Sequence, residues 1–159
     1  MRKRKLILIA VIFAVTALSA IAWAMPRSET SSSKDTIEIR EKMFATQVTD
    51  VYLNADDYLG KTIKLEGIFK TEQWGWVNAV QTYCYVVRYG PGGCCGIDAN
   101  VGFEVAWAKD RAQAYPGVES WVEATGVLKM YEEDGSQYLY LDLSSLKVLS
   151  KRGREFVNQ

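Results

Sequence analysis

Five segments alternate apolar with polar residues, two of them carry a glycine in mid-segment, and one helical pattern precedes them all. These observations predict an all-β domain: a small, partly open, five-stranded OB-like barrel preceded by one α-helix, with an N-terminal transmembrane or signal helix. We expect the barrel domain over residues 37–150, after a linker over residues 26–36 and before a polar tail over residues 151–159. A chain of 159 residues has room for one such domain.

The first 25 residues carry a membrane-targeting pattern. Basic residues at positions 2–5 precede residues 6–25, which are apolar apart from Thr16 and Ser19. About 20 apolar residues can cross a ~30 Å hydrocarbon core as a helix, and basic residues stay on the cytoplasmic side. We therefore expect a single-pass membrane protein with its N-terminus in the cytoplasm and its domain outside. Cleavage after Ala24, which would secrete the domain, is the alternative.

The remaining elements follow in chain order. Residues 27–34 are polar and rich in serine, which predicts a flexible tether. Apolar residues at helical spacing predict a helix over about Glu41–Leu53, and residues 54–60 are rich in turn-forming residues. From residue 61 the period changes to two. Strands are expected over residues 62–70, 83–89, 101–107, 121–131 and 137–143, with residues 146–149 as a candidate extension of the sheet.

Two of the expected strands contain a glycine at their centre. Gly67 lies in the first strand and Gly126 in the fourth, and each is followed by two apolar residues and a lysine. A glycine inside a strand marks a bulge or a sharp bend, which a small barrel needs when one strand serves two sheets. Between the fourth and fifth strands, Asp134-Gly135 predicts a tight hairpin turn.

Charge and composition exclude several classes of function. Residues 36–159 contain 13 basic and 17 acidic residues, a net charge of about −4. Because phosphate contacts supply most of the affinity for nucleic acid, we expect no nucleic-acid partner. The chain contains no histidine, which excludes a histidine-dependent catalytic triad and a histidine zinc site. We expect no enzymatic activity.

The cysteines are the strongest candidates for a functional centre. Cys94 and Cys95 are adjacent within a glycine-rich loop, Asp98 follows, and Cys84 lies in the second expected strand. Together these four residues could ligate a soft metal, Zn²⁺ or Cu⁺, although adjacent cysteines suit structural zinc geometry poorly. The alternatives are a disulfide from Cys84 to Cys94 or Cys95, a redox-active pair of cysteines, and no cofactor at all. The disulfide is considered because exported domains usually oxidise their cysteines.

Aromatic residues are abundant, and their simplest role is to fill a small core and cover its rim. The segment Trp74-Gly75-Trp76 differs because it lies in an expected loop, where it could touch the membrane interface or a partner. The carboxylates of residues 132–134 are expected to face solvent in a turn.

Three segments together resemble a known family. They are residues 59–67 ahead of a strand rich in tyrosine and valine, residues 94–99 (Cys-Cys-Gly-Ile-Asp-Ala), and residues 121–126 (Trp-Val-Glu-Ala-Thr-Gly). This combination, over residues 54–149, resembles the C-terminal domain of YcgQ-type bacterial membrane proteins. The resemblance implies an OB-like fold, a membrane setting and a permease or other membrane protein as partner. It implies no reaction.

The leading functional hypothesis is therefore a membrane-anchored, extracytoplasmic binding or accessory module, linked to transport, whose double-cysteine loop binds a soft metal. A thiol-disulfide redox protein is one alternative, although the loop has no adjacent Lys or Arg to lower the pKa of a thiol. A structural interaction domain stapled by a disulfide is the other.

Overall fold

The computed structural model describes residues 36–75, 80–90 and 99–157. The expected membrane segment and all but the last residue of the expected linker lie outside these ranges. Within them, the structure contains no helix that is long and apolar enough to cross a membrane.

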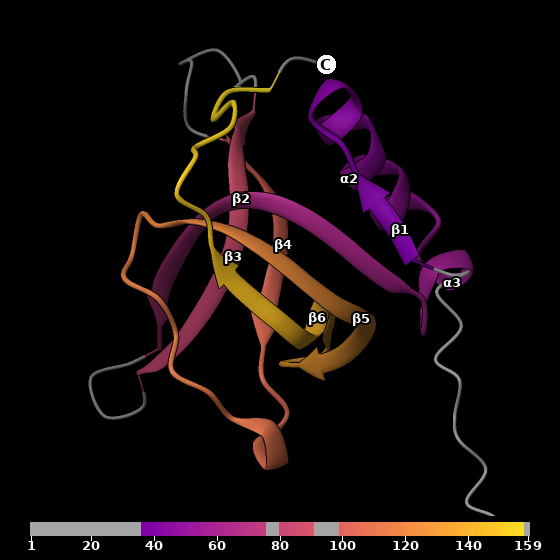
Figure 1. Ribbon diagram of the computed structural model, residues 1–159. Helices are drawn as coiled ribbons and strands as arrows, with labels where there is room; N and C mark the ends of the chain where they lie inside the picture. The colour runs from indigo at the N-terminus through magenta and orange to yellow at the C-terminus, as the bar shows by residue number, and fades with distance from the viewer. Residues whose placement is uncertain (1–35, 76–79, 91–98, 158–159) are drawn as a thin grey trace, which may run out of the picture. The chain divides into compact units, whose positions relative to one another are not determined.

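The described part of the chain is mostly β-structure, with one substantial helix near its start (Figure 1). Its elements are β1 (Thr36–Ile39), the 3-10 turn η3 (Glu41–Met43), α2 (Phe44–Leu53), α3 (Ala55–Tyr58), β2 (Thr62–Trp74), β3 (Gln81–Gly90), β4 (Ala99–Ala106), the 3-10 turn η4 (Lys109–Arg111), β5 (Trp121–Glu133) and β6 (Ser136–Val148). All five predicted strands and the predicted helix are present. The strand at β1 and the single helical turn α3 were not predicted.

Five strands close into a barrel. Their hydrogen-bonded order is β2-β3-β4-β6-β5, and a further pairing of β5 with β2 completes the ring. The β4–β6 pair is parallel and the other barrel pairs are antiparallel. β1 adds to the outside of β2 as a parallel neighbour. The five-stranded barrel is thus confirmed, but the expected partly open form is wrong because β2 pairs on both of its edges.

The two central glycines lie where the barrel bends, as predicted. β2 pairs with β5 over Thr62–Ile68 and with β3 from Ile68 onward, so the change of partner falls next to Gly67. A Cβ on Gly67 would lie 2.7 Å from the carbonyl oxygen of Val87. The β5–β6 register shifts between Thr125 and Gly126, which is a β-bulge. At Gly67 and Gly126 a side chain would collide with the backbone of the neighbouring strand, so only glycine fits.

The β5–β6 turn also follows its prediction. Asp134 and Gly135 have φ values of 50° and 77°, the left-handed values that a two-residue hairpin turn requires. β5 and β6 then stay paired almost to both ends. None of the last residues of β5, positions 129–133, is fully buried, so this end of the hairpin extends past the buried core.

The core fills the barrel and continues under α2. Phe44, Val48 and Val51 of α2 are buried, and they join barrel residues such as Phe103 and Leu141 in one cluster. Tyr52 stacks on Phe103 with ring centroids 5.3 Å apart. β1 and α2 therefore form a cover on one side of the barrel (Figure 1).

The C-terminal segment differs from the polar tail expected over residues 151–159. Val157 is buried, its amide donates to the carbonyl oxygen of Tyr89 at 2.8 Å, and the amide of Tyr89 donates to Glu155 at 2.8 Å. Phe156 also packs on the Tyr89 ring. These bonds attach residues 155–157 to β3 close to its end at Gly90, so this part of the segment is not a free tail.

Candidate functional site

A row of polar and aromatic side chains crosses the outer face of the barrel. Tyr85 of β3 pairs with Glu104 of β4, Glu104 pairs with Tyr140 of β6, and Tyr140 pairs with Lys129 of β5. Alternate residues point to opposite faces of a strand. The intervening neighbours Val86, Phe103, Leu141 and Leu128 belong to the buried core. The four paired residues therefore face outward, side by side on four strands.

A cleft of about 570 Å³ lies at one end of this outer face; we call it the tyrosine cleft. It is bounded by the end of β2, the start of β3 and the β5–β6 hairpin. Its lining residues are Glu72, Trp74, Gly75, Gln81, Tyr83, Tyr85, Glu104, Tyr131, Glu133, Asp134 and Tyr138. The cleft thus combines five aromatic rings with four carboxylates.

Two tyrosine–carboxylate hydrogen bonds organise the cleft. The Tyr131 hydroxyl donates to Glu104 Oε2 at 2.8 Å, and the Tyr83 hydroxyl donates to Glu133 Oε2 at 2.7 Å. Tyr131 also stacks on Tyr138, with ring centroids 5.4 Å apart. Each bond joins strands that are far apart in sequence, so the folded barrel holds these side chains in place before any ligand arrives.

Burial perturbs the ionisable groups of the cleft. Partial burial raises the pKa of the Glu104 carboxyl, the nearby charge of Glu133 raises it further, and the Tyr131 hydrogen bond opposes both. The pKa of Tyr83 rises to about 12, first through its hydrogen bond to Glu133 and then through burial. Burial raises the pKa of Tyr85 to about 12 as well. These phenols remain hydrogen-bond donors at neutral pH. Perturbed groups gathered in a cleft are typical of functional sites.

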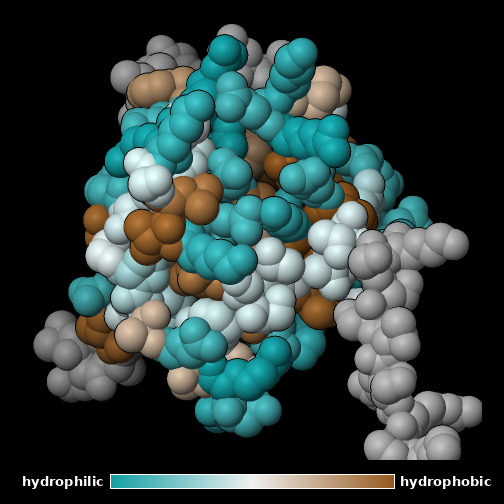
Figure 2. Space-filling view, viewed as in Figure 1, coloured by the Kyte–Doolittle hydropathy of each residue, from teal (hydrophilic) through white to brown (hydrophobic). Residues whose placement is uncertain are grey.

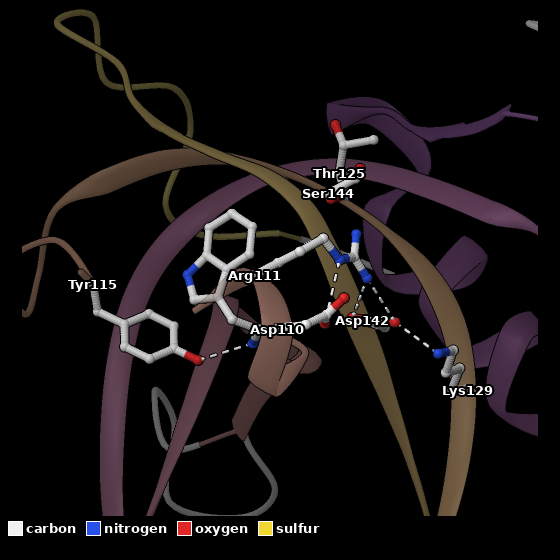
Figure 3. A network of polar contacts seen from close by, with 8 residues as sticks. Asp110, Arg111, Tyr115, Thr125, Lys129, Asp142 and Ser144 are labelled. Atoms are coloured by element: carbon white, nitrogen blue, oxygen red, sulfur yellow. Dashed lines mark hydrogen bonds and ion pairs between the residues drawn. The ribbon is translucent and has the colours of Figure 1, made fainter. Parts of the chain in front are cut away.

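A second cleft, of about 780 Å³, adjoins the first and shares Tyr83, Glu104 and Tyr131 with it. Its other end is closed by a charge network around Asp142, shown in Figure 3. Asp142 is buried; Arg111 Nη2 contacts both of its carboxylate oxygens at 3.2 Å, and Lys129 Nζ lies 2.6 Å from one of them. The network ties η4 to β5 and β6. Arg111 and Lys129 are therefore already paired with Asp142, whereas a further cation, Lys109, lines the same cleft.

The connection between β4 and β5 is held at a second point by Tyr115. The Tyr115 ring stacks on Phe69 at 5.5 Å, and its hydroxyl accepts from the Trp107 amide at 3.2 Å. The connection leads from η4 along the side of the barrel that lies away from α2 in Figure 1. Its attachments make it a fixed wall of the second cleft.

Of the predicted metal ligands, only Cys84 lies within the described residues. Its half-buried thiol contacts the Tyr115 hydroxyl, and burial raises its pKa. A raised pKa disfavours the thiolate that redox chemistry needs. The described residues contain no group of three or more Cys, Asp, Glu or His side chains that could hold a metal ion.

Cys94, Cys95 and Asp98 lie outside the described residues, so their predicted role stays a prediction. Cys84 stands six residues before Gly90, where β3 ends and the cysteine loop begins. At about 3.3 Å per residue this is about 20 Å. Arg88, the basic residue nearest the loop, is buried between the rings of Phe44 and Trp121.

Sequence reasoning missed the tyrosine cleft. It treated the tyrosines as core or rim residues and the carboxylates of residues 132–134 as solvated turn residues. One signal was available: Tyr83 and Tyr85 stand two residues apart in β3, and Tyr131 and Glu133 do so in β5. Such spacing puts each pair on one face of its strand. Trp74, which was singled out, does lie on the cleft and is 64 % exposed.

On the side of the molecule shown in Figure 2, hydrophobic residues form small patches separated by hydrophilic side chains. Scattered patches of this kind are normal on a protein surface. The concave, aromatic and acidic surface of the tyrosine cleft is thus the most distinctive candidate site in the described part of the chain.

Comparison with known proteins gives a family but no activity. The model of the DUF1980 C-terminal domain matches residues 19–158, which is most of the chain. This match confirms the resemblance to the C-terminal domain of YcgQ-type proteins. No curated relative matches the chain. The chain therefore belongs to the DUF1980 C-terminal domain family.

Proposed function

We propose that this protein is a membrane-tethered, extracytoplasmic binding module and that the tyrosine cleft is its ligand site. The observation that carries this proposal is the place of the cleft on the barrel. OB barrels bind ligands on the face of their second and third strands, between the loop that joins strands 1 and 2 and the loop that joins strands 4 and 5.

The barrel strands support that comparison. β2, β3 and β4 follow one another in the sheet and β5 returns beside β2, which is the Greek-key order of an OB barrel. In this numbering β3 and β4 are the second and third barrel strands. They contribute Tyr83, Tyr85 and Glu104 to the cleft, while Trp74 lies beside the first loop and Asp134 in the second. The strand order supports the OB-like assignment, and the position of the cleft on these strands supports the binding role.

The membrane setting rests on residues 1–25 and on the family resemblance. We propose that residues 6–25 anchor the domain and that a permease or other membrane protein is its partner. Extraction of membranes with alkaline carbonate tests the anchor. An uncleaved anchor leaves the chain in the membrane pellet, whereas cleavage after Ala24 releases a shorter chain to the supernatant. Recovery of the intact chain in the cytoplasmic fraction would contradict the proposal.

The cleft is tested by ligand binding to the full-length chain in an uncharged polyoxyethylene detergent, with ¹³C-labelled tyrosine rings. The probes are choline, spermidine, maltotriose and N-acetylglucosamine. We expect at least one probe to shift the resonances of Tyr83, Tyr131 and Tyr138, while Tyr58 and Tyr89, which do not line the cleft, stay unchanged. A panel in which no probe moves the cleft tyrosines would count against this function.

A further inference from the structure

We infer that the tyrosine cleft takes a small organic cation, an alkylated ammonium group, as its ligand. This inference rests on the proposed function of the cleft and adds the chemical class of what it binds. Three features of the cleft support it: the sign of its charge, the way its carboxylates are held, and its aromatic walls.

The charged residues among the described lining of the cleft are all acidic. Glu72, Glu104, Glu133 and Asp134 line it, and its described lining contains no lysine or arginine. Lys129, which lies in the same outward row as Glu104, is paired with Asp142 at 2.6 Å. The carboxylates of the cleft are thus without a basic partner among its lining residues. A cation is the ligand that would compensate this charge.

Tyrosine hydroxyls hold the two central carboxylates. Glu104 and Glu133 are both half-buried, and each accepts a hydrogen bond from a tyrosine, Tyr131 and Tyr83 respectively. A phenol fixes the position of a carboxylate without neutralising it. The two charges lie close enough for Glu133 to raise the pKa of Glu104. Their charge therefore stays available to a ligand that enters between them.

The walls favour an organic cation over a metal ion. Trp74, Tyr131 and Tyr138 bring aromatic rings to the same space as the carboxylates. Aromatic rings attract alkylated ammonium groups through their negative faces, whereas hard metal ions require several oxygen ligands at close range. No group of three or more potential metal ligands exists among the residues that the structure describes. Phosphates and other anions are repelled by the same carboxylates.

Two probes of nearly equal shape test the inference: choline and its uncharged analogue 3,3-dimethylbutan-1-ol. Binding to the full-length chain is followed through the ring resonances of Tyr83, Tyr131 and Tyr138, in polyoxyethylene detergent without choline lipids. We expect choline to bind at least tenfold more tightly than the neutral analogue. We expect Glu104→Gln to weaken choline binding by at least tenfold and to leave the neutral analogue unaffected.

Glu132→Gln is the matched control, because it makes the same change of charge beside Glu133 but is exposed and does not line the cleft. It should bind choline like the wild-type chain. If Glu104→Gln does not fold, Glu133→Gln, beside the hairpin turn, provides the same measurement.

The outcomes separate this inference from the function on which it rests. Equal binding of both probes at the cleft tyrosines would overturn the cation inference and leave the binding cleft in place. The same conclusion would follow if maltotriose shifted the cleft tyrosines and choline did not. If no probe shifted these tyrosines, both the inference and the proposed function would fail. An equal loss of choline binding in Glu132→Gln and Glu104→Gln would also overturn the inference, because the effect would then not belong to the cleft.

Discussion

Gly102 gives a sharp test of how the fold is held together, because an added Cβ there would meet the neighbouring backbone at a very short distance. Gly102 of β4 pairs with Val87 of β3. In Gly102→Ala, the new Cβ would lie 2.1 Å from the carbonyl oxygen of Val86 and 2.7 Å from the Cα of Val87. Real Cβ atoms essentially never approach closer than 3.0 Å, so the two strands must separate by about 0.9 Å. The obstacles are backbone atoms, and no side-chain rotation can relieve the clash.

The expected loss is about 3 kcal/mol. Overpacking of a well-packed region costs about 1–3 kcal/mol, and each weakened hydrogen bond adds about 1 kcal/mol. The movement would also disturb α2, since the Tyr52 hydroxyl donates to the Gly102 carbonyl oxygen at 3.2 Å. Domains are stable by about 5–15 kcal/mol in all, so the barrel should survive with a melting temperature lower by about 10 °C.

Thermal unfolding of the full-length chain, followed by circular dichroism, measures this loss. The control is Gly117→Ala, in the β4–β5 connection, where the nearest atom to a new Cβ is the Ser120 Oγ at 3.8 Å. This control should change the stability by less than about 0.5 kcal/mol. If Gly102→Ala were as stable as Gly117→Ala, the close packing of β3 on β4 would not hold as described.

Three further predictions concern charged and phenolic groups. Asp142→Asn should cost about 1–2 kcal/mol in a thermal melt, because it leaves Arg111 and Lys129, both half-exposed, without their buried partner; an unchanged melt would mean that the network adds nothing. Burial raises the folded pKa of Glu104, so the stability that its protonation contributes is present below its ordinary pKa and is lost as the pH rises through the folded value. Glu104→Gln lacks this loss, so its stability in calorimetry should rise relative to the wild-type chain as the pH increases above 4.5, the ordinary pKa of a glutamate carboxyl, and a relative fall would contradict the assignment. Tyr83 and Tyr85, with pKa values of about 12, should ionise above pH 11 in an absorbance titration at 295 nm and destabilise the fold as the pH rises from 10 through 12. Replacing both with phenylalanine should reduce the amplitude of that late phase without removing it, because the pKa of Tyr52 is also raised to about 12; an unchanged amplitude would contradict the assignment.

Local sequence patterns were sufficient to predict most of the barrel. Period-two alternation located all five barrel strands, and Asp134-Gly135 identified the hairpin because its left-handed backbone needs residues of this kind. Gly67 and Gly126 marked the bends for a similar local reason. The sequence pattern did not predict β1, because its four residues form a strand only by pairing with β2, more than 20 positions further along the chain.

The candidate site depends on information that local patterns do not contain. Tyr131 meets Glu104, and Tyr83 meets Glu133, only because of the pairing register of four strands. A shift of one residue would turn these side chains into the core. Cys84 illustrates the converse: it stands only six residues before Gly90, yet the extended strand puts about 20 Å between these two residues.

The position of β1 decides where the preceding chain joins the barrel relative to the tyrosine cleft. β1 pairs with the first residues of β2, while the cleft begins at Trp74, the last residue of the same 13-residue strand. A membrane tether that enters at Thr36 therefore joins the barrel at the end of β2 remote from the cleft. The attachment point at Thr36 and the cleft thus lie at opposite ends of β2, so the tether proposed for residues 26–35 would not need to cross the cleft.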